Sequence, residues 1–445
     1  MVSQPFLWSC IDGSRPGLIP CLLDRSKNVH LDVHIISHRV EEVIAYINPH
    51  VTRLRGIHFN LNFDDASQLM VLLDLNPAPS LRRLKIECDE GLVSDHLRFT
   101  PGIVEPIASL HHLELFGFPI TPQLVQLRNL TFLSIDVSLS TLRVPLDLIS
   151  GNPLLKVIRL WGQVEGVFED NGHPPGSINL PHLEVLLSER IPLVHLEALS
   201  PPHGARILSG FARGASPNHR TRGPYAASFP IPESFSNLQD LRKLRLMDQG
   251  EIYVKLEGKK GSITYCMPRD RQFGSGTYIG VPLEEVTDAT YEISSSLWHQ
   301  SKGEPATSRP MVSRIVCGMV RLQNLELSCF SAEQVDYFLL VLHSTNVCRD
   351  LKSLVLSHCV ELYRQMRSLA TMAEGRKAAG IGLNTVRIVH TNLELVKITF
   401  KPEDVTKLEH AVGTLEYVEA DRGWLGQSLL GFDPQIGIIQ PYMFF

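Results

Sequence analysis

The sequence predicts a mixed α/β protein built as a leucine-rich-repeat solenoid, with a curved parallel sheet inside, helices outside and irregular repeats. Three observations support this expectation. The apolar pattern L-x-x-L-x-L recurs along most of the 445 residues, helical periodicity lies between several of its copies, and 445 residues exceed the usual size of one compact core.

Nine copies of the pattern carry the repeat. They are Leu54-Ile57-Phe59, Leu81-Leu84-Ile86, Leu110-Leu113-Leu115, Leu130-Leu133-Ile135, Leu155-Ile158-Leu160, Leu241-Leu244-Leu246, Leu322-Leu325-Leu327, Leu351-Leu354-Leu356 and Leu383-Val386-Ile388. A weaker copy has Leu183 and Leu186, with Ser188 in the third apolar position. The last two apolar residues are two apart, so they share one face of a short strand. Because one such strand cannot bury its own apolar face, the copies are expected to stack into a parallel sheet.

Three segments between the strands predict helices. Residues 38–48 place Val40, Val43, Ile44 and Ile47 on one helical face. Residues 331–334 form a capping box that begins a second helix with an apolar side running to Leu342. Residues 402–412 predict a third helix, with Gly413 as its C-cap.

The repeats divide the chain into four segments. We expect N-terminal leucine-rich repeats at 1–199, a Pro/Gly/Arg-rich loop at 200–236, a repeat strand plus a β-hairpin excursion at 237–310, and C-terminal leucine-rich repeats at 311–445.

The two irregular segments differ in composition. The loop at 200–236 contains several prolines and four arginines, and either a basic binding arm or an inert insertion explains it. A flaw in the gene prediction is a further alternative. Residues 252–256 and 263–267 alternate apolar and polar around a Gly-Lys-Lys-Gly turn, which predicts the hairpin, and the remainder of the excursion is expected to be loosely ordered.

Composition narrows the class of protein. A net charge of −5 gives no global case for binding nucleic acid or membranes, and no apolar run is long enough to span a bilayer. The N-terminus lacks the features of a secretory signal. Eight cysteines without a CxxC pair predict reduced, mostly buried thiols and a cytoplasmic or nuclear protein.

No catalytic, metal or cofactor motif is recognisable. The glycines of 274–280 have the wrong spacing for a phosphate-binding loop, and those of 426–431 are too far apart for a nucleophile elbow. His30 and His34 fall on an expected strand about 13 Å apart, too far to share a metal. We therefore expect a non-enzymatic protein without a cofactor; an enzyme within 250–310 is the weaker alternative.

The residues between the apolar positions should point away from the core, and many are basic. Eleven basic residues stand there: Arg55, Arg82, Arg83, Lys85, Lys156, Arg159, Arg242, Lys243, Arg245, Lys352 and Arg387. Only three acidic residues, Glu114, Glu184 and Glu326, share these positions. We expect all of the basic residues except Arg55 and Arg387 to form a concave face that binds an acidic or phosphorylated segment of a partner protein. The alternative is that they are solvated residues beside buried leucines. Few aromatic residues interleave with them, so a nucleic acid partner is not expected.

Two stretches resemble a known family. The first is Leu7-Trp8-Ser9-Cys10-Ile11-Asp12, followed by Arg15-Pro16, by residues 22–27 and by Leu31-Asp32-Val33. It is similar to the segment after the F-box in F-box/leucine-rich-repeat-like proteins of mushroom-forming fungi (basidiomycetes). The second, residues 351–359, resembles the cysteine-type repeat of F-box proteins and ends at Cys359.

The resemblance implies a role in ubiquitin ligation. In that family the F-box helices bind the Skp1 adaptor of a cullin-RING (SCF) ubiquitin ligase, and the repeats recruit a substrate. This chain begins where the F-box should already have ended, so we do not expect it to bind Skp1 itself. Either an upstream segment is missing or the chain is a repeat-only relative. The alternative function is a stand-alone leucine-rich-repeat scaffold with no link to ubiquitin.

Overall fold

The computed structural model describes most of the chain, in segments. These are residues 4, 8–36, 40–61, 78–88, 109–117, 120, 124–137, 142–162, 173–189, 191, 193–210, 231–248, 251–268, 283–293, 316–328, 332–344, 346–359, 362–391 and 399–420. The chain divides into two compact units. Unit 1 comprises Met1–Asp240, Gly258–Cys266 and Thr277–Val281, and unit 2 comprises Leu241–Glu257, Met267–Gly276 and Pro282–Phe445.

Unit 1 contains a parallel sheet. Its strands, in the order in which they pair, are β1 (Cys10–Asp12), β2 (Leu31–Ile36), β3 (Leu54–Leu61), β4 (Arg83–Cys88), β5 (His112–Phe116), β6 (Phe132–Asp136), β7 (Val157–Trp161), β9 (Val185–Glu189), β11 (Arg206–Gly210) and β14 (Ser262–Pro268). Two short strands, β8 (Ile178–Asn179) and β10 (Leu199–Ser200), pair separately.

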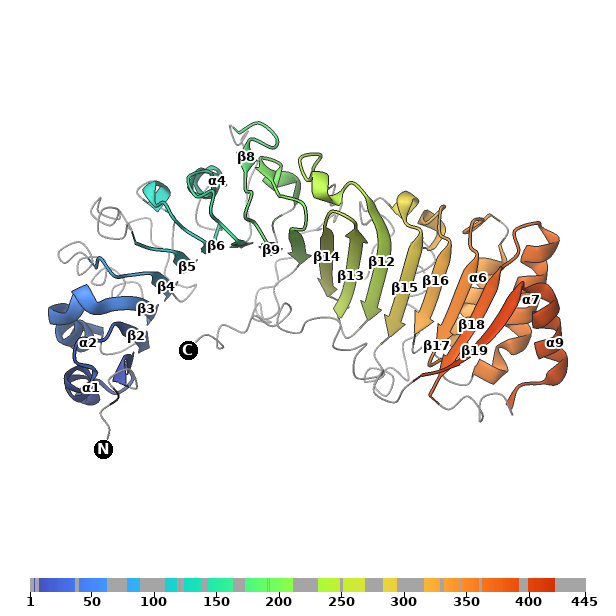
Figure 1. Cartoon of the computed structure of the whole chain (residues 1–445), viewed down its shortest axis with the longest axis horizontal. Helices are drawn as coiled ribbons and strands as arrows, with labels where there is room; N and C mark the ends of the chain where they lie inside the picture. The colour runs from blue at the N-terminus through green and yellow to red at the C-terminus, as the bar shows by residue number, and fades with distance from the viewer. Residues whose placement is uncertain are drawn as a thin grey trace. The chain divides into compact units, whose positions relative to one another are not determined.

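Unit 2 contains a second parallel series (Figure 1). It runs through β12 (Leu241–Asp248), β15 (Asp288–Ile293), β16 (Asn324–Ser328), β17 (Ser353–Ser357), β18 (Thr385–His390) and β19 (Thr414–Glu419). Strand β13 (Glu251–Gly258) follows β12 along the chain.

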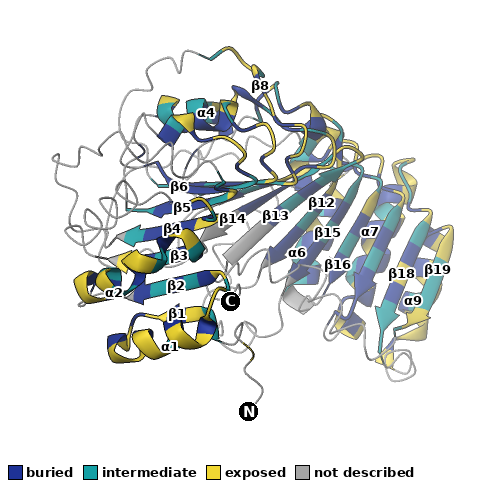
Figure 2. Ribbon diagram, turned by 60° about the vertical axis from the view of Figure 1, so that its left-hand side comes forward, coloured by how far each residue is buried: buried dark blue, intermediate teal, exposed yellow. Residues whose placement is uncertain are grey.

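Each of the nine L-x-x-L-x-L copies forms a strand with all three apolar residues buried. In the second copy, Leu81, Leu84 and Ile86 are at most 2% exposed. Along the strands, buried residues alternate with half-exposed ones (Figure 2). The expected strands and their parallel pairing are therefore confirmed.

A common turn begins many of these strands. The amide of the first leucine donates to the carbonyl oxygen three residues earlier, as in Leu81 to Ala78 (3.0 Å) and Leu155 to Asn152 (3.2 Å). The carbonyl of the next residue then accepts from two amides of the following strand; Arg82 accepts from His111 and His112 at 2.9 and 3.0 Å. Repetition of these contacts sets the register, so equivalent side chains line up across neighbouring strands.

One buried asparagine joins three segments of unit 1. Asn152 is fully buried, and its Oδ1 accepts from the Leu130 amide at 3.0 Å. Its Nδ2 donates to the carbonyls of Leu127 (2.9 Å) and Leu148 (2.8 Å). The side chain thus satisfies backbone groups that no strand or helix pairs.

Helices and 3-10 turns connect the strands. The α-helices are α1 (Ile19–Ser26), α2 (Val40–Ile47), α4 (Arg143–Ser150), α6 (Ala332–His343), α7 (Met366–Ala378) and α9 (Pro402–Ala411). The 3-10 helices are η2 (Pro16–Leu18), η3 (Asn48–Arg53), η5 (Leu124–Gln126), η6 (Leu193–Leu196), η7 (Ser236–Leu238), η8 (Leu283–Glu285) and η10 (Leu362–Arg364). In unit 2, α7 packs against both α6 and α9 (Figure 1). Phe338 of α6 contacts the buried Tyr291 of β15 at 5.5 Å between ring centroids, so α6 covers the apolar face of the sheet.

The predicted helices agree in position with α2, α6 and α9, although Ser331 of the capping box lies outside the described residues. Gly413 is not a C-cap, because α9 ends at Ala411 and Val412 has an extended backbone. The Gly413 amide instead donates to the Leu383 carbonyl at 3.2 Å. A Cβ at Gly413 would lie 2.7 Å from the carbonyl oxygen of Asn384, so a glycine is needed for close approach to the neighbouring strand.

The described parts of the two irregular segments contain strands. Within 200–236, residues 206–210 form β11, which pairs with β9 and buries Ile207; residues 211–230 lie outside the described residues. Within 237–310, the amide of Gly258 donates to Gly261 at the expected turn, but β14 itself pairs with β11, so this strand does not leave the sheet of unit 1. Strand β15 occupies part of the stretch expected to be loose.

The cysteines also differ from expectation. Among the described free cysteines, Cys10, Cys21 and Cys317 are exposed and Cys348 and Cys359 are buried. Across the described segments, none of the helices has the length and apolar character needed to cross a membrane.

Candidate interaction surface

The face of the unit 1 sheet opposite the buried leucines carries rows of polar and aromatic side chains, and we call it the open face. The start row contains the residue before the central apolar position, the middle row the residue after it, and the end row the residue after the last apolar position. Register aligns Arg83, Lys85 and Glu87 of β4 with His112, Glu114 and Phe116 of β5. Neighbouring strands are about 4.8 Å apart, so side chains in one row contact each other.

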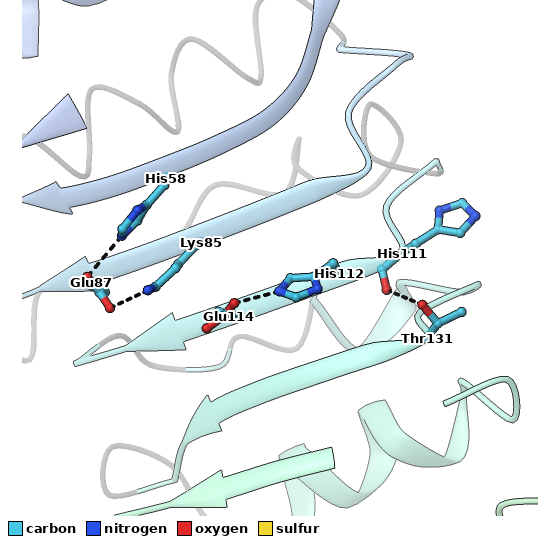
Figure 3. Close-up of polar contacts among 7 residues, drawn as sticks. All are labelled: His58, Lys85, Glu87, His111, His112, Glu114 and Thr131. Atoms are coloured by element: carbon cyan, nitrogen blue, oxygen red, sulfur yellow. Dashed lines mark hydrogen bonds and ion pairs between the residues drawn. The ribbon is translucent and has the colours of Figure 1, made fainter. Parts of the chain in front are cut away.

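Glu87 is held by two donors from the open face (Figure 3). Its Oε2 lies 3.1 Å from His58 Nε2 on β3, and its Oε1 lies 2.9 Å from Lys85 Nζ on β4. Burial by itself would raise the pKa of Glu87, but the hydrogen bonds from His58 and Lys85 outweigh burial and lower this pKa to about 2. Glu87 is therefore ionised at neutral pH.

Histidines occupy the same face of neighbouring strands. His34 of β2 stacks on His58 at 4.3 Å between ring centroids, and burial followed by the charge of His58 lowers the pKa of His34. His112 Nε2 lies 2.6 Å from Glu114 Oε1 (Figure 3). The ring of His112 also stacks on that of Phe132, at 4.0 Å between ring centroids. Burial opposes ionisation of Glu114, but the hydrogen bond from His112 prevails and lowers the pKa of this carboxyl group.

Strand β6 has short side chains between the longer ones of β5 and β7. Ser134 is fully buried and Asp136 is 6% exposed. The rings of Phe116 on β5 and Trp161 on β7 approach to 3.7 Å between centroids, across the strand that carries Asp136. Two large aromatic residues therefore meet over a strand with small polar ones.

Most of the predicted basic residues are neutralised by carboxylates within the chain. Ion pairs join Arg55 and Arg83 to Asp32, Lys85 to Glu87, Lys156 to Glu184, Arg159 to Glu189, Arg245 to Glu292, and Arg387 to Glu416. Lys85 is also only 9% exposed. The other four are exposed; Arg82, Lys243 and Lys352 have no ion pair within the described segments, whereas Arg242 has a contact inside the chain. Arg242, Lys243, Arg245, Lys352 and Arg387 belong to unit 2, so the predicted residues divide between the two units.

The sequence count of charges was incomplete, because it omitted the end row. Three carboxylates lie there in unit 1, Glu87, Asp136 and Glu189, and Glu292 has the equivalent position in unit 2. The described residues of this row contain no Lys or Arg in either unit. The described face is therefore mixed in charge. The predicted basic residues lie in or before the middle row, and carboxylates also lie on this face, at Asp32 in the start row and throughout the end row.

Sequence reasoning also missed the histidine and aromatic residues of this face. Sequence analysis considered His34 only as a metal ligand and did not consider His58. Both follow the central apolar residue of their strands, which is the position that the basic residues Lys85 and Arg159 take. An alignment of equivalent positions in the repeats could have predicted that these histidine and aromatic residues lie side by side.

The described segments contain no group of three or more His, Cys, Asp or Glu side chains that could hold a metal ion. The chain is thus a mixed α/β protein with a mostly parallel sheet and a polar, aromatic open face. No protein-family model matches the chain, and comparison with curated proteins gives no match.

Proposed function

We propose that this chain is a leucine-rich-repeat solenoid that binds another protein through the open face of its sheet. The observation that carries the proposal is the register of unit 1, which aligns half-exposed His, Phe, Trp and charged side chains on the face opposite the leucine core. Because buried and half-exposed residues alternate along the strands, one face of the sheet packs in the core and the other is available to contact a partner.

The physical properties of this face suit a protein partner. Phe116 and Trp161 offer large contact area with few rotatable bonds, and the ion pairs hold the charged side chains in position before binding. Protein–protein interfaces are commonly enriched in aromatic residues and arginine. No catalytic arrangement is part of the proposal.

The resemblance to F-box proteins gives the proposal a cellular context. On that basis the chain corresponds to the substrate-recognition part of an SCF ubiquitin ligase component in the cytoplasm or nucleus. An acidic or phosphorylated segment of the substrate would meet the exposed basic residues near the strand starts, such as Arg82. The second candidate is a stand-alone scaffold with no ubiquitin link.

Site-specific photo-crosslinking tests the proposal. A benzoylphenylalanine replaces Phe132 on the open face or, as the matched control, Tyr46 on α2; both positions are half-exposed and belong to unit 1. Crosslinking in cells followed by mass spectrometry should identify a protein captured from position 132 and not from position 46. Equal capture at both positions, or none at 132, would contradict the proposal.

Co-purification separates the two candidate functions. The experiment is run with the chain alone and with any upstream coding sequence of its gene. Skp1 and cullin should be recovered with the crosslinked complex of the extended chain if the chain serves an SCF ligase. Their absence from a complex that still contains a specific crosslinked partner would favour the stand-alone scaffold.

A further inference from the structure

A continuous group of apolar side chains lies on the open face of unit 1, from β6 to β11. In the start row, register places Val157 between Phe132 and Val185. In the middle row, Leu187 lies beside Leu208. Val185 and Leu187 are two residues apart on β9, so they share one face of the strand and join the two rows. All five residues are half-exposed, and we call them the apolar strip.

The apolar strip is separate from the leucine core. The core on the other face of the same four strands contains Leu133, Ile158, Leu186 and Ile207, each fully buried. Single half-exposed apolar residues are common on protein surfaces, whereas a contiguous group of them is typical of an interaction site. The apolar strip is therefore a candidate contact surface for a partner.

The charged residue nearest to the apolar strip points away from its start row. Arg159 stands in the middle row of β7, beside Leu187. Its guanidinium pairs with Glu189, in the end row of β9, at 3.2 Å. Because this ion pair holds the charge of Arg159 toward the strand ends, the start row keeps its apolar character.

The strands beneath the apolar strip offer no backbone edge to a partner. Each of β6, β7, β9 and β11 pairs with a neighbouring strand on both sides. A partner segment therefore contacts side chains alone and cannot add a strand to the sheet here. An extended segment would place its own unpaired amide and carbonyl groups against apolar side chains, which is unfavourable. A helix avoids this cost, because its backbone hydrogen bonds are internal.

The size of the apolar strip matches a short helix. From β6 to β11 the strip crosses three strand spacings, about 14 Å. A helix rises about 1.5 Å per residue, so about ten residues cover this distance. Apolar residues at positions i, i+3, i+7 and i+10 of one helical face would follow the strip from end to end.

One positive charge lies at the β11 end of the apolar strip. Arg206 stands in the start row of β11, beside Val185, and is exposed. Among the residues that the structure describes, no ion pair involves Arg206, whereas nearby Lys156 and Glu184 pair with each other at 3.6 Å. A carboxylate of the partner would therefore find a complementary charge at Arg206.

We infer that the apolar strip binds an amphipathic helix of the partner protein, which lies across β6 to β11 and places an acidic residue at Arg206. This inference rests on the proposed function and names the kind of segment that the open face recognises. The apolar side of the helix supplies the contact area, and the acidic residue fixes the direction of the helix across the strands.

The test uses four fluorescein-labelled peptides of about 16 residues, long enough for the four apolar positions. The first is a hydrocarbon-stapled helix with leucines at i, i+3, i+7 and i+10 and a glutamate beside the last leucine. The second is a stapled scramble of the same composition, the third has two interior prolines instead of the staple, and the fourth has glutamine for the glutamate. Fluorescence anisotropy should show that the first peptide binds at least about tenfold more tightly than the second and third.

A double variant tests the apolar strip itself. Val157→Thr/Val185→Thr replaces two methyl groups by hydroxyl groups and keeps β-branched residues in the strands. It should weaken binding of the first peptide by about tenfold, because less apolar surface is buried. The matched control is Val29→Thr, at a half-exposed valine of unit 1 outside the apolar strip, which should leave binding unchanged. Circular dichroism melting should show that each variant is folded.

The charge contact has its own variant. Arg206→Gln should weaken binding of the glutamate peptide by about threefold and leave binding of the glutamine peptide unchanged. Equal weakening of both peptides would overturn the contact between Arg206 and an acidic residue.

The helix itself is overturned if the scrambled or proline-containing peptide binds as tightly as the first, or if the double valine variant binds like the original chain. Sedimentation velocity examines a second copy of this chain as the occupant: a dimer that dissociates in the double valine variant would assign the apolar strip to that copy and also overturn the inference. With specific crosslinking still seen from position 132, either result leaves the proposed function standing. Absence of that crosslinking would instead remove the proposed function itself.

Discussion

The guanidinium of Arg376 on α7 donates a hydrogen bond of 2.6 Å to the carbonyl oxygen of Cys348, in the turn that precedes β17. A second nitrogen donates to the carbonyls of Leu342 (3.0 Å) and Val347 (3.2 Å), at and beyond the end of α6. Arg376 is fully buried. One side chain therefore satisfies three carbonyls near the C-terminal end of a helix, where a positive charge is favoured.

Replacement of Arg376 by Met should destabilise unit 2 by about 3 kcal/mol, because three buried carbonyls lose their donor. Urea denaturation followed by circular dichroism measures the effect. The matched control is Arg367→Met on the same helix; Arg367 is exposed and lies 3.8 Å from Asp404, so its loss should change stability by less than about 1 kcal/mol. Equal effects of the two substitutions would contradict the role given to Arg376.

Gly56 lets the Asp32 carboxylate reach across a strand. Asp32 on β2 accepts from Arg83 on β4 at 2.9 Å and also pairs with Arg55, and a Cβ at Gly56 of β3 would clash with the Asp32 carboxylate. Gly56→Ala should therefore lower stability by about 1–2 kcal/mol through local strain and loss of exposed ion pairs.

Two controls accompany this prediction. Gly17→Ala should have little effect, because nothing lies within 4 Å of its added Cβ. In the background of Asp32→Ala, the Gly56→Ala change should lose most of its effect. Persistence of the full destabilisation in that background would show that the Asp32 contact is not its cause.

Stability at acidic pH should depend on Glu87. Its pKa is lowered from 4.5 to about 2, so its contribution is fully present above pH 4.5 and is lost as the pH falls toward 2. Glu87→Gln should remove a pH-dependent contribution of about 2–3 kcal/mol. Urea denaturation between pH 7 and pH 2 measures it, with exposed Glu403→Gln on α9 as the control. If the free energy of unfolding of Glu87→Gln fell with pH as steeply as that of the original chain, the contribution assigned to Glu87 would be ruled out.

The cysteines should differ in reactivity toward iodoacetamide. Burial raises the pKa of Cys348 to about 12, and Cys359 is also buried, so both thiols should stay unmodified in the native protein. Exposed Cys21 and Cys317 should be alkylated first. Peptide mass spectrometry after brief alkylation at pH 8 reads out each site. Early modification of Cys348 would show that this part of unit 2 opens in solution.

The repeat pattern located the leucine-rich strands but missed others of the same spacing. In Val286-Ala289-Tyr291, the last two residues lie in β15 and Val286 lies just before it. In Val412-Leu415-Tyr417, the last two residues lie in β19 and Val412 lies just before it. Both retain the apolar spacing while replacing most of the leucines. Spacing is dictated by the alternation of a strand, whereas residue type only has to fill the core.

The repeat spacing predicts which residues lie on the open face, but it does not predict which of their charges pair across strands. Asp32 and Arg83 are 51 residues apart in the chain, and their pairing depends on the glycine between them in space. Likewise, Phe116 and Trp161 meet because β6 lies between their strands with small side chains. Such contacts join different repeats, so a count made within each repeat could not find them.

The amino-acid sequence by itself determined which side chains enter the core and that the leucine-bearing strands stack in parallel, because apolar spacing acts locally within each strand. The tertiary structure alone decided which charges meet and where the histidines and aromatic rings gather. Those properties arise between strands, since Coulomb and ring contacts depend on distances that only the register and the small intervening residues establish.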